Sequence, residues 1–291
     1  MYMIDLHCHS RASDGSCTPS EIVALAVKCG LHAIALTDHD TMDGLAEFRR
    51  AGEGASVECV PGIELASRKQ GEYNGYHIVG LYLRESVSDE MSELLASCIR
   101  WRQERNLGIL ERLNEKGFPV TLSEVQQVAG GDVIGRPHIA LALVRRGIVS
   151  SVAGAFERFL GSGKAAYVHR QEPSPEAAIS AIHSMGGVAI WAHPFTKGNR
   201  TVRQIHQLAV DLKAIGLDGI EVHYSMHTAR QVQNAAEIAR EVGLLPSGGS
   251  DFHGLTFRNV QMGIGAGNLQ VPDRYLEPLR FCASRWNALN G

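Results

Sequence analysis

The chain has 291 residues, 44% of them hydrophobic and 20% charged, values that are typical of globular proteins and exclude a disordered or fibrous chain. A net charge of -3 and a pI near 6.5 give no overall attraction to nucleic acid or to an anionic membrane, so a polyanion must be bound locally. Charged and imidazole groups near the N-terminus predict that the chain has no signal peptide and no membrane span, and therefore that it is cytoplasmic. The six cysteines are scattered and form no CxxC pair, so we expect them to be reduced core residues.

Seven short apolar runs are predicted to be strands, and most of them are followed by a stretch that favours a helix. They cover residues 2–6, 33–37, 57–63, 76–83, 188–191, 219–222 and 244–247. Strands that alternate with helices are typical of parallel sheets, because a parallel connection needs a long crossover. The sequence therefore predicts an α/β fold, a barrel of seven strand and helix units.

About a hundred residues between the fourth and fifth strands contain no convincing strand. Helices are predicted there over 89–117, 122–129, 137–146 and 152–160. We therefore expect a barrel formed by residues 1–99 and 161–291, with a small helical insertion, 100–160, that covers the active site. Residues 100–164 carry ten Arg and Lys against six Asp and Glu. This excess suits a phosphate-bearing substrate, although an exposed helix surface of mixed charge gives similar counts.

Histidines and carboxylates stand at the ends of six predicted strands. His7 and His9 end the first strand and point to the same side, because side chains alternate along a strand. The carboxyl ends of the strands of a β/α barrel converge on one face, so groups that are distant in sequence can meet there. A lone histidine is usually a core or surface residue, but six such ends are hard to explain by packing, since burying unpartnered ionisable groups is costly and cations satisfy them. The nine predicted metal ligands are His7, His9, Asp14, His39, Glu64, His77, His193, Asp251 and His253.

The motifs around these ligands resemble those of the PHP (polymerase and histidinol phosphatase) family. They are Asp5-Leu6-His7-Cys8-His9-Ser10, Thr37-Asp38-His39-Asp40, Gly62-Ile63-Glu64, His77, Ala192-His193-Pro194 and Gly248-Gly249-Ser250-Asp251-Phe252-His253. The resemblance implies a distorted (β/α)7 barrel of the TIM type with a trinuclear metal centre. One implied ion is held by His7, His9 and Asp251. A second is held by His77 and His193, with Glu64 bridging the two, and a third by Asp14, His39 and His253.

Two segments of the insertion, Gly135-Arg136-Pro137-His138-Ile139-Ala140 and Gly161-Ser162-Gly163-Lys164-Ala165-Ala166-Tyr167-Val168, resemble the nucleotide-processing branch of the family. That branch includes 3′,5′-nucleoside bisphosphate phosphatases, which convert adenosine 3′,5′-bisphosphate to AMP. It also includes enzymes that trim RNA from its 5′ end.

The chain has no GxSxG elbow, Walker P-loop or cysteine nucleophile motif, so water activated by metal is the expected nucleophile. Imidazole and carboxylate ligands without thiolate favour Mn, Fe or Zn. We expect two or three divalent ions, with Mn preferred. Glu64 and His223 are the predicted catalytic residues.

Several residues are predicted to bind the phosphate that does not react. A guanidinium can bind phosphate in a bidentate manner, and a lysine can bind it as a point charge, so Arg136, Lys164 and Arg200 are the candidates. His138 and His223 are candidates for contacting phosphate or for protonating the leaving oxygen. His223 follows the sixth apolar run, 219–222, which would place it at the barrel mouth, and supporting a metal ligand is an equal alternative for it.

The predicted function is hydrolysis of the 3′-phosphate of nucleoside 3′,5′-bisphosphates. The alternatives are a 5′-to-3′ exoribonuclease acting on short 5′-phosphorylated RNA, a histidinol phosphate phosphatase, and a metal-stabilised nucleotide-binding module without catalysis. A basic, aromatic-lined groove would favour RNA, and Trp101 amid three arginines is the sequence's one hint of it. The expected partners are a small nucleotide or short RNA, with no membrane and no stable protein partner.

Overall fold

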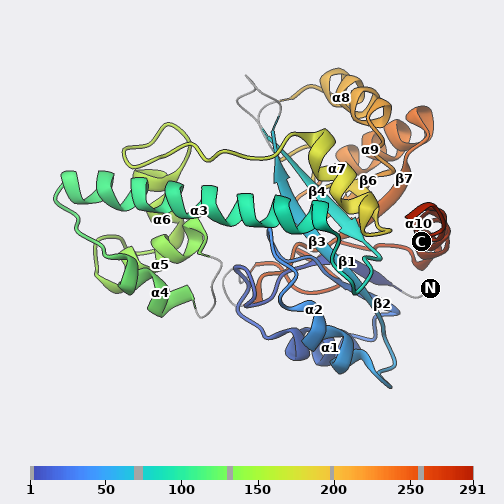
Figure 1. Ribbon diagram of the computed structural model, residues 1–291, viewed down its shortest axis with the longest axis horizontal. Helices are drawn as coiled ribbons and strands as arrows, with labels where there is room; N and C mark the ends of the chain where they lie inside the picture. The colour runs from blue at the N-terminus through green and yellow to red at the C-terminus, as the bar shows by residue number, and fades with distance from the viewer. Residues whose placement is uncertain (1–2, 69–74, 130–133, 197–199, 255–258, 291) are drawn as a thin grey trace.

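The computed structural model describes residues 3–68, 75–129, 134–196, 200–254 and 259–290, and its centre is a nearly closed barrel (Figure 1). Seven strands form one sheet in chain order, so sequence neighbours are also neighbours in space. Backbone hydrogen bonds of 2.8 Å from Asp251 to His7 and from His9 to Phe252 join the two ends of the sheet. The strands are β1 (Ile4–Cys8), β2 (Ala33–Leu36), β3 (Glu58–Ser67), β4 (Tyr76–Leu81), β5 (Val188–Trp191), β6 (Gly219–Tyr224) and β7 (Leu245–Gly249).

The predicted strands are thus found with small shifts, and residue 2 of the first one lies outside the described part of the chain. In the described part of the chain six helices accompany the barrel, of which five lie between successive strands and the sixth follows β7. They are α1 (Pro19–Lys28), α2 (Leu45–Gly52), α7 (Pro175–Ser184), α8 (Val202–Ala214), α9 (Ala229–Val242) and α10 (Leu276–Asn290).

The fourth strand runs against its neighbours, which corrects the expectation of a wholly parallel barrel. β4 pairs antiparallel with β3 and with β5, whereas the other adjacent pairs are parallel. β3 ends at Ser67 and β4 begins at Tyr76, so residues 68–75 are too few to form a crossover helix. The reversal places His77 near the start of β4, opposite Ala66 near the end of β3. His77 therefore still lies at the face where the parallel strands end.

Alternating side chains divide the hydrophobic core into an inside and an outside. On β2, Ala33 and Ala35 point into the barrel, while Ile34 and Leu36 pack outward with residues of α1 and α2. Helix α10 packs residues such as Leu279 against the inner cluster and contacts β5. It therefore closes the barrel at the end where the chain enters β1, away from the face that carries the histidines.

Helix α10 is fastened to the barrel by Trp286. Its ring stacks on His183 of α7 with 3.6 Å between ring centres, and its Nε1 donates to Asp218 Oδ1 at 3.2 Å. We expect Trp286→Ala to lower the free energy of unfolding by about 3 kcal/mol, since packing is lost and a buried carboxylate loses a donor. Phe281→Ala on the same helix, where the side chain is 67% exposed, should change it by less than about 0.5 kcal/mol. Urea unfolding measures both, and equal losses would contradict the prediction.

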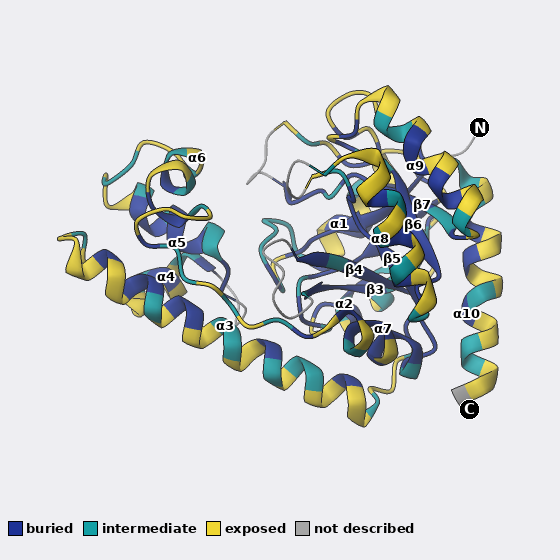
Figure 2. Cartoon of the chain, turned by 90° about the horizontal axis from the view of Figure 1, so that it is seen from above, coloured by how far each residue is buried: buried dark blue, intermediate teal, exposed yellow. Residues whose placement is uncertain are grey.

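A long helix, α3 (Asp89–Glu115), connects the barrel with a group of smaller helices (Figures 1 and 2). α4 (Leu122–Ala129), α5 (Arg136–Arg145), α6 (Val152–Ala155) and a π-helix, Phe156–Leu160, build a separate hydrophobic cluster on its second half. The first half of α3 packs on α7 of the barrel. The predicted helices are therefore found, except that the last is α-helical only over its first turn. The boundaries expected at residues 99 and 161 stay a prediction, because α3 packs against both parts.

Of the helices in the described part of the chain, none has the length and hydrophobicity that crossing a membrane requires. All six cysteines are free. Cys8 and Cys98 are buried, but Cys29 is exposed, so the expectation that all of them are core residues is wrong for Cys29.

Candidate metal centre

The nine predicted ligands converge at one face of the barrel. β1, β3 and β4 carry one each, namely His7, Glu64 and His77, and the other six follow β1, β2, β5 and β7 in the chain. Nitrogen and oxygen atoms of eight of them, all except His193, form three overlapping groups, and within each group all ligand atoms lie within 4.8 Å of one another. The groups are His7, His9, Glu64 and Asp251; His39, Glu64 and His77; and His9, Asp14, His39 and His253.

Glu64 is the centre of this arrangement, and only 1% of its side chain is exposed. Its Oε1 lies 2.6 Å from His77 Nδ1 and 3.1 Å from His193 Nε2. Its Oε2 lies 2.9 Å from His39 Nδ1 and 3.4 Å from the Nε2 atoms of both β1 histidines. One carboxylate therefore faces five imidazoles, and it could be shared between two cations as the family resemblance implies.

These groups agree in part with the three ligand sets that the family resemblance implies. The first and third groups contain the implied sets completely. The second contains His39 where His193 was expected, although His193 also contacts Glu64. Which residue holds which ion stays a prediction.

Unsatisfied buried atoms show that the cluster fits divalent cations. His7 Nε2, both ring nitrogens of His9 and Glu64 Oε2 are buried, and none of them has a partner in hydrogen-bond geometry among the described residues, even though Glu64 Oε2 lies 2.9 Å from His39 Nδ1. Buried polar atoms of native proteins nearly always have a partner, because leaving them without one is costly. Metal ions would satisfy all four atoms, and the mixture of imidazole and carboxylate suits Mn, Fe or Zn.

The charges in the cluster also favour metal binding. Burial by itself would raise the pKa of Glu64, but His39 and His77 hold that pKa well below its usual range. Burial, together with the charge of His253, lowers the pKa of His9 to about 4. At neutral pH Glu64 is therefore ionised and His9 is neutral, the forms in which both can bind a metal.

Two buried aspartates outside the ligand set hold the loops that carry ligands. Asp38 accepts hydrogen bonds from the backbone N of Ser10 at 2.7 Å and from Ser13 Oγ at 2.5 Å, which fixes the loop before Asp14. Asp5 accepts from the backbone N of Ser250 and of Gly263, both at 2.8 Å. Both aspartates belong to the motifs quoted above, but the sequence alone assigned them no role.

The backbone is strained at two predicted ligands that follow the ends of β5 and β7. His193 has φ 33° and Asp251 has φ 58°, a left-handed conformation that residues other than glycine rarely adopt. Gly249 lies so close to β1 that a Cβ atom on it would stand 2.4 Å from His7 Cβ. A residue without a side chain at position 249 is therefore required for β7 to approach β1.

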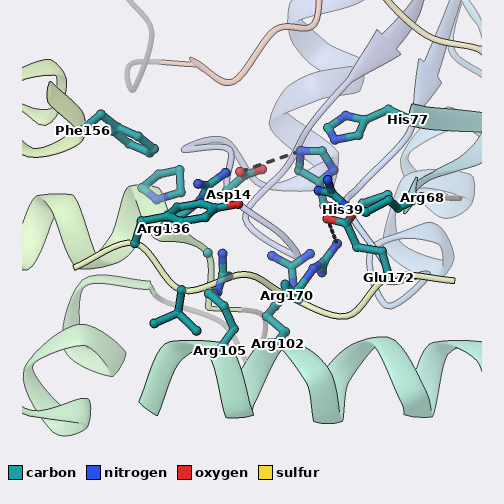
Figure 3. Close-up of a pocket in the computed structure, with 15 residues that line it drawn as sticks. Asp14, His39, Arg68, His77, Arg102, Arg105, Arg136, Phe156, Arg170 and Glu172 are labelled. Atoms are coloured by element: carbon teal, nitrogen blue, oxygen red, sulfur yellow. Dashed lines mark hydrogen bonds and ion pairs between the residues drawn. The ribbon is translucent and has the colours of Figure 1, made fainter. Parts of the chain in front are cut away.

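A pocket of about 240 Å³ adjoins the metal cluster and lies between the barrel and the insertion (Figure 3). Asp14, His39 and His77 of the cluster belong to its lining. Phe156 of the insertion and Tyr167 add aromatic rings to the lining. The lining also contains five arginines, namely Arg68, Arg102, Arg105, Arg136 and Arg170. A concave, strongly cationic space beside the cluster is suited to an anionic substrate.

Of the residues predicted to bind phosphate, Arg136 lines the pocket. Its guanidinium lies 5.7 Å from the ring centre of Phe156 and 5.9 Å from that of Tyr167. Lys164 is exposed and does not belong to the pocket lining. Arg200 packs over the ring of Tyr76 at 5.4 Å and is also absent from the lining.

The two histidines proposed to contact substrate lie elsewhere. His138 is buried, and its Nδ1 accepts a hydrogen bond of 3.0 Å from the backbone N of Gly135, so it caps α5. His223 Nε2 lies 3.3 Å from Tyr275 Oη, and His223 does not line the pocket. An irregularity in the pairing of β6 with β7 shifts the alternation after Glu221.

As a result, the next residue, Tyr224, faces the cluster instead of His223. Its hydroxyl donates to Asp251 Oδ2 at 3.0 Å, and its ring centre lies 5.3 Å from that of His193. The predicted catalytic and phosphate-binding roles of His223 are therefore not supported by its position.

Residues 5–161 match the family model described as the PHP domain. The chain belongs to the PHP family. It is therefore a PHP metal-dependent phosphoesterase, and the seven-stranded barrel with its histidine and carboxylate cluster agrees with that assignment.

Two relatives of this PHP protein carry specific names. A 5′-3′ exoribonuclease of Haemophilus influenzae is 40% identical, over 86% of this chain and 89% of its own length. A 3′,5′-nucleoside bisphosphate phosphatase of Chromobacterium violaceum is 35% identical, over 87% of this chain and 88% of its own length. A crystal structure of a candidate metal-dependent phosphoesterase from Bifidobacterium adolescentis superimposes with a TM-score of 0.85 and 29% identity, covering 97% and 96% of the two chains.

Proposed function

We propose that this PHP protein hydrolyses the 3′-phosphate of nucleoside 3′,5′-bisphosphates. The observation that carries the proposal is the arginine-lined pocket that shares Asp14, His39 and His77 with the metal cluster. A substrate with two phosphates can place one at the cluster and the other among the arginines. A monophosphate would leave the second position empty and lose its charge-assisted hydrogen bonds.

The residues of the chain divide into two functional sets. The nine predicted ligands would hold the cations, with Glu64 facing imidazoles from several parts of the barrel. When bound, divalent cations lower the pKa of a water molecule and stabilise the charge that develops on a reacting phosphate. The arginines bind and orient the other phosphate, and Phe156 and Tyr167 hold Arg136 between their rings.

Short 5′-phosphorylated RNA is the second candidate substrate, favoured by the 40% identity to an exoribonuclease. The chemistry is the same in both cases, because water attacks the phosphorus on the 3′ side of a nucleotide that carries a 5′-phosphate. Only the group beyond that phosphorus differs, a free oxygen in the bisphosphate and the next ribose in RNA. The aromatic and cationic lining of the pocket is compatible with both substrates.

The test is phosphate release by the Mn-loaded protein from adenosine 3′,5′-bisphosphate, in parallel with AMP, histidinol phosphate and a short 5′-phosphorylated RNA. We expect fast release from the bisphosphate and none from AMP, since AMP lacks a 3′-phosphate. Release of nucleotides from RNA alone would make the protein an exoribonuclease. Turnover of none of the four would refute the proposed substrate class. Chelation should abolish hydrolysis and added Mn should restore it, whereas a binding module would show no hydrolysis in either state.

A further inference from the structure

The pocket arginines differ in whether a carboxylate is paired with them. Arg68 Nε lies 3.0 Å from Glu172, and Arg170 lies 2.6 Å from Asp40, which also accepts a hydrogen bond from Arg102. The other two pocket arginines, Arg105 and Arg136, form no ion pair with any carboxylate in the described part of the chain. Two carboxylates thus form ion pairs with three of the pocket arginines, and the other two arginines have no carboxylate partner among the described residues.

Asp40 is held rigidly between the barrel and the insertion. Its carboxylate is buried, and besides the two arginines it accepts a hydrogen bond of 3.2 Å from the backbone N of Ala66. Its own backbone N donates to the carbonyl of Glu64 at 3.0 Å, and its φ of 53° is left-handed. A residue kept in a strained conformation by several contacts indicates that its position matters for function.

Arg105, unlike Arg102 and Arg170, has no carboxylate partner among the described residues. It rises from α3 into the pocket beside Arg102 (Figure 3), and only 7% of it is exposed. Its Nε and Nη2 atoms are buried and lack a hydrogen-bond partner among the described residues. Burial, together with the charges of Arg102 and Arg170, lowers its pKa. A buried guanidinium without a counterion is costly, and a bound anion would remove that cost.

We propose that Asp40 is a specificity-determining residue that acts as an internal counterion, occupying Arg102 and Arg170 so that the anionic group of the ligand binds to Arg105 beside Arg136. The inference rests on the proposed function only in taking that group to be the second phosphate of the substrate. A tetrahedral dianion is the chemical class that matches two adjacent guanidinium groups.

Sulfate is the probe, and its affinity for the Mn-loaded protein is measured from the increase in melting temperature with sulfate concentration. Arg105→Gln should weaken sulfate binding by at least about tenfold, the effect of losing hydrogen bonds to a charged group. Arg102→Gln, which removes an arginine that Asp40 already occupies, should weaken it less than about threefold. Equal losses in these two variants would overturn the proposal.

Asp40→Asn gives the sharper test, because it should tighten sulfate binding by about tenfold by releasing two arginines. Combined with Arg105→Gln it should restore nearly the affinity of the unmodified protein. A defect in folding does not tighten anion binding, so this readout separates the proposed role from a structural one. Unchanged or weaker sulfate binding in Asp40→Asn would overturn the inference.

Asp43→Asn is the matched control, since Asp43 is an exposed residue of the same loop and its replacement should leave sulfate affinity unchanged. The sulfate measurement is independent of turnover. A protein that hydrolyses none of the four substrates would refute the proposed function and leave the role of Asp40 to be decided by sulfate alone.

Discussion

Replacing Glu64 with glutamine is expected to reduce hydrolysis by at least about a thousandfold, because several kcal/mol of transition-state stabilisation would depend on the cations that Glu64 is proposed to hold. Both of its oxygens lie near imidazole nitrogens, at distances from 2.6 to 3.4 Å. Glutamine keeps the size of the side chain but replaces one acceptor with an N–H donor. The loss of negative charge and the new donor both oppose the binding of a cation at this position.

The measurements are kcat for the preferred substrate and the metal content of the purified protein. Both should fall in Glu64→Gln. The matched control is Glu58→Gln, on the same strand, where the carboxylate pairs with Arg280 at the surface and its loss should change kcat by less than about twofold. If Glu64→Gln keeps its metal and its rate, Glu64 is not the bridging ligand.

The metal cluster could be predicted from the sequence because two simple regularities fix it. Alternation puts His7 and His9 on one side of a strand, and the carboxyl ends of the strands share one face of the barrel. His77 lies at this face even though β4 is reversed, since a short connection after Ser67 returns the chain to the same face. A histidine near one end of a predicted strand was therefore informative about the metal cluster even where the direction of the strand was predicted incorrectly.

The pocket could be predicted only in small part. Arg102 and Arg105 stand three residues apart and therefore share one face of a helix, a signal that the sequence does contain. Arg170 gives no such signal, because it follows the insertion in a segment without regular structure. Whether it reaches Asp40 depends on how the insertion packs on the barrel, which no local pattern encodes. The same limit explains why Lys164 was expected in the pocket and lies outside it.

The prediction for His223 is not supported by the position of that residue, for a different reason. It assumed that strand alternation continues to the end of β6, but one extra residue in the pairing with β7 changes which side chain points to the cluster. A β-bulge has no reliable signature in a single sequence. The structure therefore assigns the position facing Asp251 to Tyr224, a residue that the sequence did not single out.

Glu221 also lies at the cluster but was not predicted from the sequence, because it lies within the apolar run 219–222. It is buried, and its Oε1 lies 3.1 Å from His7 Nδ1, while its Oε2 accepts a hydrogen bond of 2.6 Å from the backbone N of His193. A carboxylate at Nδ1 keeps the proton on that nitrogen and leaves His7 Nε2 free to bind a metal. Glu221 thus orients one ligand through its ring and another through its backbone.

Glu221→Gln is therefore expected to lower metal affinity by about 10- to 100-fold, the usual effect of losing such a supporting carboxylate. If the new amide donates to His7 Nδ1, the imidazole proton must move to Nε2, the atom that faces Glu64 and Asp251. If the amide turns the other way, its N–H meets the N–H of His193, and one hydrogen bond is lost. Either orientation opposes metal binding, while the overall fold should remain, because the side chains have nearly the same size.

Competition between the protein and a chelator of known affinity measures this effect, and circular dichroism checks that the variant is folded. Glu241→Gln is the control, since that carboxylate is 48% exposed and pairs with His206 at the surface, where ion pairs contribute little. A metal affinity in Glu221→Gln equal to that of the control would mean that the tautomer of His7 is set by the metal itself. A loss confined to Glu221→Gln would instead show that the chain prepares His7 for its ligand role before any metal arrives.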